Sequence, residues 1–169
     1  MGPPTILGLD LGTDTGVAFF DGKAIAATNW KLGTAQEIKR WGQTRQTRRG
    51  DPRVFRFFDA LNKVVVQYNP SVIIFEDVLF STYRLQAQLW SSFRTVVWLV
   101  ASRANKICEC VSTSGLKKFA TGHGGADKPM MKAALFKQYP EFKAQDLSDD
   151  AVDAIWLVLW GKQHLGRLI

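Results

Sequence analysis

The stretch from Ile6 to Phe20, which reads ILGLDLGTDTGVAFF, constrains the fold more than any other part of the chain. An apolar run ends on a single carboxylate, Asp10, and a glycine-rich turn then leads into a second apolar run. Short apolar runs bounded by such turns are typical of buried strands. We therefore predict a strand that carries Asp10 at its end, and we predict that three later acidic residues join Asp10 in a metal site.

Five strands are predicted, at residues 5–10, 17–20, 23–29, 71–76 and 107–111. The first three should form an antiparallel meander, and each of the last two follows a helix. Four helices are predicted, at residues 52–69, 85–105, 128–138 and 149–165. The first should pack through Val54, Phe58, Leu61, Val65 and Tyr68, which recur at helical spacing. Residues 32–50 are expected to be an exposed arm or loop, and residues 112–127 a short helical turn with a basic loop. The pattern predicts an α/β fold, a five-stranded mixed sheet flanked by helices.

Composition limits the class of protein. A length of 169 residues suits one domain, so residues 1–169 are predicted to fold as a single unit. The net charge of +7 and the pI of about 9.6 favour a polyanionic partner. Cys108 and Cys110 are too close for an ordinary disulfide, which indicates free thiols in a reducing compartment. With no secretion signal and no apolar run of about 20 residues, the sequence predicts a soluble intracellular protein.

Four carboxylates, Asp10, Glu76, Asp150 and Asp153, are candidates for one site. Asp10 and Glu76 each close an apolar strand, where an uncompensated charge is costly. Asp150 and Asp153 are three positions apart on a predicted helix, hence on one face. Such a cluster repels itself unless a cation such as Mg²⁺ binds. Alternatively, Asp150 complements the helix dipole beside the capping residue Ser148, and Asp10 is a turn residue.

Basic and aromatic residues supply candidate DNA contacts. They are Arg45, Arg48, Arg49, Lys117, Lys118, His123 and Lys128, with Leu79, Phe80 and Tyr83 after Glu76. Lys128 follows a glycine-rich loop and begins a helix, where an ammonium group and backbone N–H groups can meet a phosphate. The apolar and aromatic side chains could wedge into or stack on bases at a distorted DNA site. Each group also has a simpler interpretation, as a solvated loop or as local packing.

Four segments together resemble the RuvC Holliday junction resolvases, especially the phage-encoded type, within the RNase H-like superfamily. They are GLDLGTDTGVAFF, IIFEDV, KKFATGHGGADK and LSDDAVDAIWLVLW. The resemblance implies an RNase H-like fold and a homodimer in the cytoplasm of a bacterial or phage-infected host cell. It also implies two Mg²⁺ ions, replaceable by Mn²⁺, on Asp10, Glu76, Asp150 and Asp153. Lys128 falls where the family has a basic residue near the scissile phosphate, and Leu79 or Phe80 where it inserts a side chain at the junction centre.

The resulting functional hypothesis is two-metal-ion hydrolysis of four-way DNA junctions, leaving 5′-phosphate and 3′-hydroxyl ends. Asp10 would bridge both ions, Glu76 and Asp150 would hold one each, and Asp153 would complete the shell. Alternatives are a broader flap or fork nuclease of the same fold, a non-catalytic DNA-binding module, and a fragment of an actin-like ATPase. The last also begins with a turn like DLGTDTG, but 169 residues leave no room for its second domain. The hypothesis includes no nucleotide cofactor and no membrane.

Overall fold

The computed structural model describes residues 4–43, 50–77 and 84–168. Its strands form one sheet in the order β3-β2-β1-β4-β5. Their bounds are β1 Ile6–Asp10, β2 Asp14–Phe20, β3 Ile25–Lys31, β4 Val72–Asp77 and β5 Ile107–Ser112. β1, β2 and β3 pair antiparallel, whereas β4 is parallel to both β1 and β5. This is the mixed five-stranded sheet that the sequence predicts.

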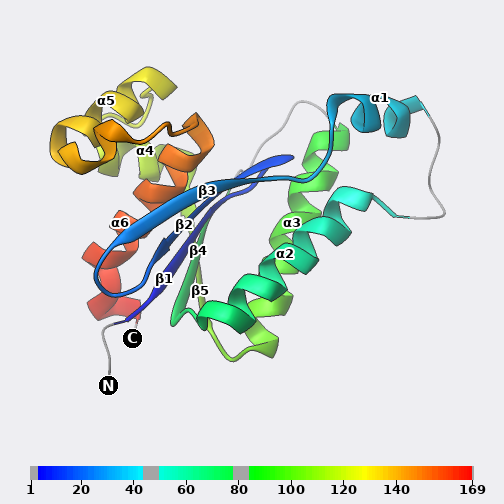
Figure 1. Cartoon of the computed structure of the whole chain (residues 1–169), viewed down its shortest axis with the longest axis horizontal. Coiled ribbons are helices and arrows are strands. Elements are labelled where there is room, and N and C mark those ends of the chain that lie inside the picture. Colours follow the sequence, from blue (N-terminus) through cyan, green and yellow to red (C-terminus); the bar gives the residue numbers. More distant parts are fainter. Residues whose placement is uncertain (1–3, 44–49, 78–83, 169) are drawn as a thin grey trace.

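Helices cover both faces of the sheet (Figure 1). They are α1 Ala35–Gln43, α2 Pro52–Tyr68, α3 Arg84–Arg103, α4 Thr113–Thr121, α5 Lys128–Gln138 and α6 Asp149–Leu168, with a 3₁₀ turn η1 at Pro140–Ala144. α2 and α3 lie on one face, and α6 lies on the other with α4 and α5 beyond it (Figure 1). None of the helices within the described ranges is long and apolar enough to cross a membrane.

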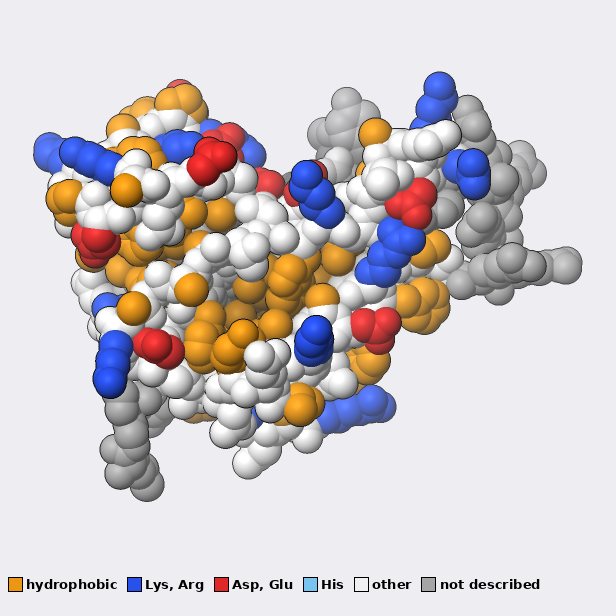
Figure 2. Space-filling view, viewed as in Figure 1, with side chains coloured by type: hydrophobic (Ala, Val, Ile, Leu, Met, Phe, Trp, Pro, Cys, Tyr) orange, Lys and Arg blue, Asp and Glu red, His pale blue; other side chains and the backbone are white. Residues whose placement is uncertain are grey.

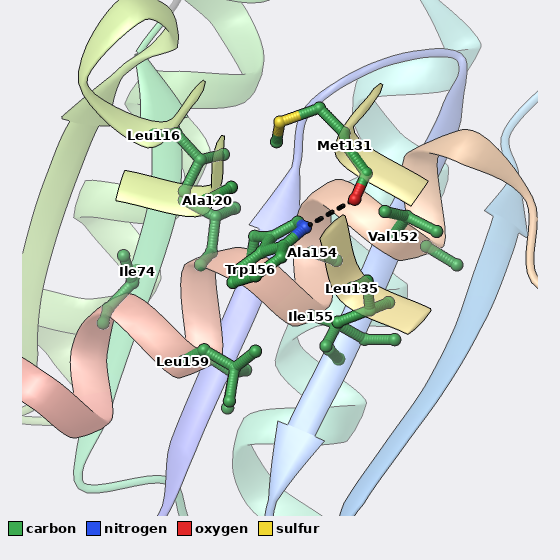
Figure 3. Close-up of a cluster of buried hydrophobic side chains, with 14 of the residues drawn as sticks. Ile74, Leu116, Ala120, Met131, Leu135, Val152, Ala154, Ile155, Trp156 and Leu159 are labelled. Atoms are coloured by element: carbon green, nitrogen blue, oxygen red, sulfur yellow. Dashed lines mark hydrogen bonds between the residues drawn. The ribbon is translucent and has the colours of Figure 1, made fainter. Parts of the chain in front are cut away.

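Side chains that point alternately to the two faces of the sheet contribute to two separate apolar cores. On β1, Leu7 and Leu9 pack with Phe57 and Phe93 of the α2–α3 layer. Ile6 belongs instead to the core on the α6 side. There the indole of Trp156 is fully buried, and its Nε1–H donates to the Met131 carbonyl at 3.2 Å (Figure 3). Because neighbouring residues of a strand face opposite sides, each strand contributes to both cores.

Two sequence expectations about helices were wrong. Residues 35–43, expected to be part of an arm or loop, form the helix α1. A capping box begins it: Thr34 Oγ1 accepts from the Glu37 N–H, and Glu37 Oε2 accepts from the Thr34 N–H. Residues 113–121 form the full helix α4. In α2 the buried stripe contains Phe57 with Leu61 and Val65. The Phe58 side chain is 36% exposed, because one step along a helix turns it away from the core.

The surface seen from the β3 side is mixed in character. Hydrophobic side chains gather between β3 and α2, and charged side chains of both signs surround them (Figure 2). Phe19 and Tyr68 meet between β2 and the end of α2, with ring centroids 5.1 Å apart. The described residues on this face therefore carry charges of both signs around an apolar centre (Figure 2).

Candidate metal centre

The ends of two parallel strands set Asp10 and Glu76 side by side. Leu9 of β1 is in register with Phe75 of β4, so the residues that follow them, Asp10 and Glu76, lie next to each other. Both side chains lie on the α6 side of the sheet, since the preceding residues Leu9 and Phe75 belong to the opposite core. The carboxyl ends of neighbouring parallel strands thus place two acids at one edge, as the sequence predicts.

The first turns of α6 bring a third carboxylate, Asp153, to this pair. Ser148 caps the helix, because its Oγ accepts from the Ala151 N–H at 3.1 Å. One carboxylate oxygen from each of Asp10, Glu76 and Asp153 can be chosen so that all three lie within 4.8 Å of one another. Three oxygens this close could hold a single cation in common.

Glycine lets α6 come close enough to the sheet for this meeting. A Cβ atom on Gly16 would lie 1.9 Å from the carbonyl oxygen of Asp150, and one on Gly8 would lie 2.5 Å from that of Ala154. No side chain fits at either distance. Gly16 is directly opposite Asp10 in the β1–β2 register, so the close approach occurs beside the acid pair. The glycines of the opening stretch therefore serve helix–sheet packing here.

The three acids share an environment that opposes ionisation. Burial, followed by the charges of Glu76 and Asp153, raises the pKa of Asp10 well above its usual range. Burial also raises the pKa of Glu76, against a hydrogen bond from the Thr113 side chain and the charges of two lysines. Burial and then the Glu76 carboxylate raise the pKa of Asp153 to about 7. A bound cation would relieve both the burial penalty and the mutual repulsion.

Asp150 lies one turn before Asp153 and has a different partner. Its Oδ1 is 3.4 Å from Lys128 Nζ, and Asp149 Oδ2 is 3.9 Å from the same ammonium. Asp150 does not belong to the set of oxygens within 4.8 Å, although its charge raises the pKa values of both Asp10 and Asp153. It therefore stands at the rim of the cluster, and its role as a metal ligand stays a prediction.

The positive charges of two lysines act on the acid cluster. Lys128 lowers the pKa values of Asp10, Glu76 and Asp153, and Lys117 of α4 lowers those of Glu76 and Asp153. Partial burial lowers the pKa of Lys128 itself, but Asp150 and its neighbours outweigh this and raise it. Lys128 therefore stays fully cationic beside the acids.

The other predicted DNA contacts lie away from the acid cluster or outside the described residues. Lys118 on α4 and His123 in the loop after α4 are both exposed. Six residues, Arg45, Arg48, Arg49, Leu79, Phe80 and Tyr83, lie outside the described residues. Leu79, Phe80 and Tyr83 follow shortly in the sequence after Asp77, the last residue of β4.

Two residues that contact this region are not among those predicted from the sequence. Thr113 forms a hydrogen bond to the Glu76 carboxylate, and Asn29 of β3 accepts a hydrogen bond from Ser148 at 2.6 Å. Thr113 follows Ser112, whose Oγ caps α4 by accepting from the Gly115 N–H. Serine after a strand is a cap signal that would have predicted the helix and, with it, the proximity of Thr113 to β4.

The donor set fits a hard divalent cation. Asp10, Glu76 and Asp153 offer only carboxylate oxygens, and within the described parts of the chain no other group of at least three His, Cys, Asp or Glu residues is so arranged. Oxygen-only donors suit Mg²⁺ or Mn²⁺ better than the thiolate and imidazole sites of zinc. The cluster could thus hold a metal ion, with Asp150 near enough to extend the site.

Comparison with known proteins agrees with this architecture. The chain is similar in structure to Thermus thermophilus RuvC in complex with a Holliday junction substrate, with a TM-score of 0.72, 17% identity and 96% of both chains covered. A second T. thermophilus RuvC structure gives a TM-score of 0.66 at 17% identity over 96% of both chains. The yeast mitochondrial Holliday junction resolvase gives 0.58 at 16% identity, covering 93% of this chain and 78% of that one. The five-stranded sheet with its flanking helices is thus an RNase H-like fold.

Sequence comparison gives the family. Among curated proteins, none matches the chain in sequence. The model of the family described as "Crossover junction endodeoxyribonuclease RuvC" matches residues 6–160, which include Asp10, Glu76, Lys128, Asp150 and Asp153. Because that match spans most of the 169 residues, the chain belongs to the RuvC family of crossover junction endodeoxyribonucleases.

Proposed function

We propose that the chain is a structure-selective endodeoxyribonuclease that resolves four-way DNA junctions by Mg²⁺-dependent phosphodiester hydrolysis. The observation that carries the proposal is the meeting of Asp10, Glu76 and Asp153, from β1, β4 and α6, with oxygens within 4.8 Å of one another. Buried acids that repel one another weaken the metal-free fold, so a purely structural role does not account for them. Residues 1–169 act in this proposal as one nuclease domain.

The carboxylates have separate tasks. Asp10, Glu76 and Asp153 would hold Mg²⁺ or, in its place, Mn²⁺, and Asp150 at the rim would complete a site for a second ion. When bound, such ions lower the pKa of water and neutralise charge on a phosphate, which leads to 5′-phosphate and 3′-hydroxyl products. The strand ends fix Asp10 and Glu76 rigidly, whereas Asp150 and Asp153 depend on where α6 begins.

The cations beside the site are suited to DNA. The Lys128 side chain is 59% exposed and its ammonium lies 3.4 Å from Asp150 Oδ1, so it can contact a phosphate while it stays near the acids. Lys117, Lys118 and His123 extend the same side of the molecule through α4 and the loop that follows. We assign them to backbone contacts, which position DNA without reading its sequence.

The proposed substrate is branched DNA, preferably a four-way junction. A RuvC of similar fold has been solved in complex with a Holliday junction substrate. Another protein of similar fold, from yeast mitochondria, is a Holliday junction resolvase. A junction has two-fold symmetry, which a homodimer can match by presenting one site to each of two opposed strands. The paired incision of opposed strands would separate this activity from that of a general flap or fork nuclease.

The direct test is cleavage of an end-labelled four-way junction beside a linear duplex, a flap and a fork of the same sequence at one salt concentration. The wild-type chain should nick opposed junction strands in Mg²⁺ and be inactive in EDTA. The nicks should be sealed by DNA ligase, which requires 5′-phosphate and 3′-hydroxyl ends. Cutting that persists in EDTA, or that is equal on all four substrates, would contradict the proposal.

Matched variants link that activity to the acid cluster. Asp10→Asn keeps the shape of the side chain and removes its charge, so cleavage should fall by at least about 10³-fold. Asp59→Asn makes the same chemical change at an exposed position of α2, on the opposite face of the sheet. It should cut at the wild-type rate. Equal loss in both variants would show that the effect is unrelated to the site.

A further inference from the structure

A row of residues crosses the sheet at the level of the acid pair. Asn29 of β3 is in register with Gly16 of β2, and Gly16 is in register with Asp10 of β1. Asp10 in turn lies beside Glu76 of β4, as the neighbouring pair of Leu9 and Phe75 shows. Residues in register across a sheet face the same side, so all four face α6. The row therefore runs from the β3 edge of the sheet to the proposed metal ligands.

Asn29 contacts the start of α6 through a chain of two hydrogen bonds. The Ala151 N–H donates to Ser148 Oγ at 3.1 Å, and the Ser148 hydroxyl donates in turn to Asn29 Oδ1 at 2.6 Å. A serine hydroxyl rotates freely unless its proton has an acceptor. With the proton held by Asn29, the Ser148 lone pairs are free to accept from the helix. The cap of α6 is thus fixed to the outer strand of the sheet.

This anchor acts on the helix turn that carries the acids. Asp150 directly precedes Ala151, whose N–H is the first link of the chain, and Asp153 lies one helical turn later. The Asp150 backbone packs directly on Gly16, the neighbour of Asn29, where a Cβ atom would lie 1.9 Å from the Asp150 carbonyl oxygen. A rotation or lift of this turn would carry Asp150 and Asp153 away from Asp10 and Glu76, which the strands hold in place.

We propose that Asn29 is a positioning residue for the metal centre, which acts through Ser148 to set the first turn of α6. The inference rests on the proposed function, since it assigns Asn29 a role in holding the carboxylates that would bind the metal ion. Residues that orient metal ligands without touching the ion change metal affinity by about 10-fold or more when they are removed. Asn29 itself need not contact either the cation or DNA.

The test compares Asn29→Leu, which keeps the side-chain volume and removes the acceptor, with Asn29→Asp, which keeps an acceptor oxygen. The readout is binding of Mn²⁺ alone to the full chain, followed by the electron paramagnetic resonance of free Mn²⁺. Asn29→Leu should weaken Mn²⁺ binding by about 10-fold, and Asn29→Asp should restore most of the affinity. Thr28→Leu is the control, because Thr28 is exposed on the opposite side of the same strand.

A double-variant comparison identifies the route through Ser148. Ser148→Ala should weaken Mn²⁺ binding as Asn29→Leu does, and adding Asn29→Leu to it should cause no further loss. Additive losses would mean that Asn29 acts directly, and Mn²⁺ affinity unchanged in Asn29→Leu would overturn the role altogether. A wild-type chain that binds no Mn²⁺ would overturn the proposed function, and this inference with it. Junction binding in EDTA should be the same in all variants, since none of them removes a proposed DNA contact.

Discussion

At the scale of single residues, Asp153 makes the metal-free protein sensitive to pH. Its pKa is raised to about 7 by burial and then by Glu76, whereas an aspartate in an unfolded chain titrates near 4. Between about pH 4 and pH 7 the folded state keeps a proton that the unfolded state has released. Rising pH therefore reduces the stability of the folded state across this window.

Asp153→Asn removes this penalty, because the amide does not ionise. In EDTA at pH 8 the variant should be more stable than the wild-type chain by up to about 4 kcal/mol, which a pKa difference of about three units corresponds to. The melting temperature should rise by up to about 10 °C. Near pH 3, below both pKa values, the two proteins should melt together, since Asp153 is then mostly protonated in both states. Thermal denaturation at the two pH values measures this, and a difference that is the same at both would contradict it.

Gly16 is a second residue with a specific role, which is to make room for the backbone of α6. Gly16→Ala places a Cβ atom 1.9 Å from the Asp150 carbonyl oxygen, so the helix must move. We expect a loss of about 1–3 kcal/mol of stability and weaker Mn²⁺ binding. Gly12→Ala is a milder control, since its nearest contact is Asp14 O at 3.3 Å. Denaturation in urea with Mn²⁺ titration compares the two, and equal effects would contradict the packing role of Gly16.

At the scale of elements, the strands were more predictable than the helices between them. Apolar runs such as VIIFED predict a buried strand. Because two parallel strands each end in an acid, the sequence also predicts that Asp10 lies beside Glu76. α1 was not predicted, because its residues from Ala35 onward are mostly polar and only the Thr34–Glu37 capping box marks its start. The part played by Asn29 depends on its hydrogen bond with Ser148, 119 positions away in the chain, which no local pattern in the sequence specifies.

The position of α6 depends on its packing as well as on its cap. Among the described residues Trp156 is the largest fully buried side chain, and its indole donates to the Met131 carbonyl of α5 (Figure 3). Its ring also meets those of Phe119 and Tyr139 edge-on. Trp156→Phe removes that hydrogen bond and part of the volume, and should cost about 2–3 kcal/mol in urea unfolding. Phe55→Leu, at a position of α2 that is 58% exposed, should cost much less. Equal costs would mean that Trp156 does not hold α6 in place.

At the scale of the whole molecule, the central prediction is a two-fold dimer. α3 packs on the sheet through Leu89, Phe93 and Val97, yet it also exposes Leu85, Trp98 and Leu99 at 72%, 45% and 52%. Exposed apolar side chains on a helix that is buried on its other side are available to a subunit interface. Two sites related by symmetry would also suit two opposed strands of a junction.

Light scattering at micromolar concentration tests this assembly. The wild-type chain should have about twice the monomer mass of 18.9 kDa, and Leu99→Glu should shift it toward the monomer. Val66→Glu is the matched control, because Val66 of α2 is 76% exposed and lies outside the proposed interface. A wild-type chain that is monomeric at this concentration would contradict the dimer while leaving the acid cluster unaffected.

The proposed function depends on a divalent cation that joins the ends of β1 and β4 to α6. The most direct measurement is the anomalous scattering of Mn²⁺ in crystals of the full chain. A peak should appear within coordination distance of Asp10, Glu76 and Asp153 in the wild-type protein, and it should be absent in Asp10→Asn. Mn²⁺ bound only elsewhere, or no peak among these three carboxylates at saturating Mn²⁺, would contradict the account.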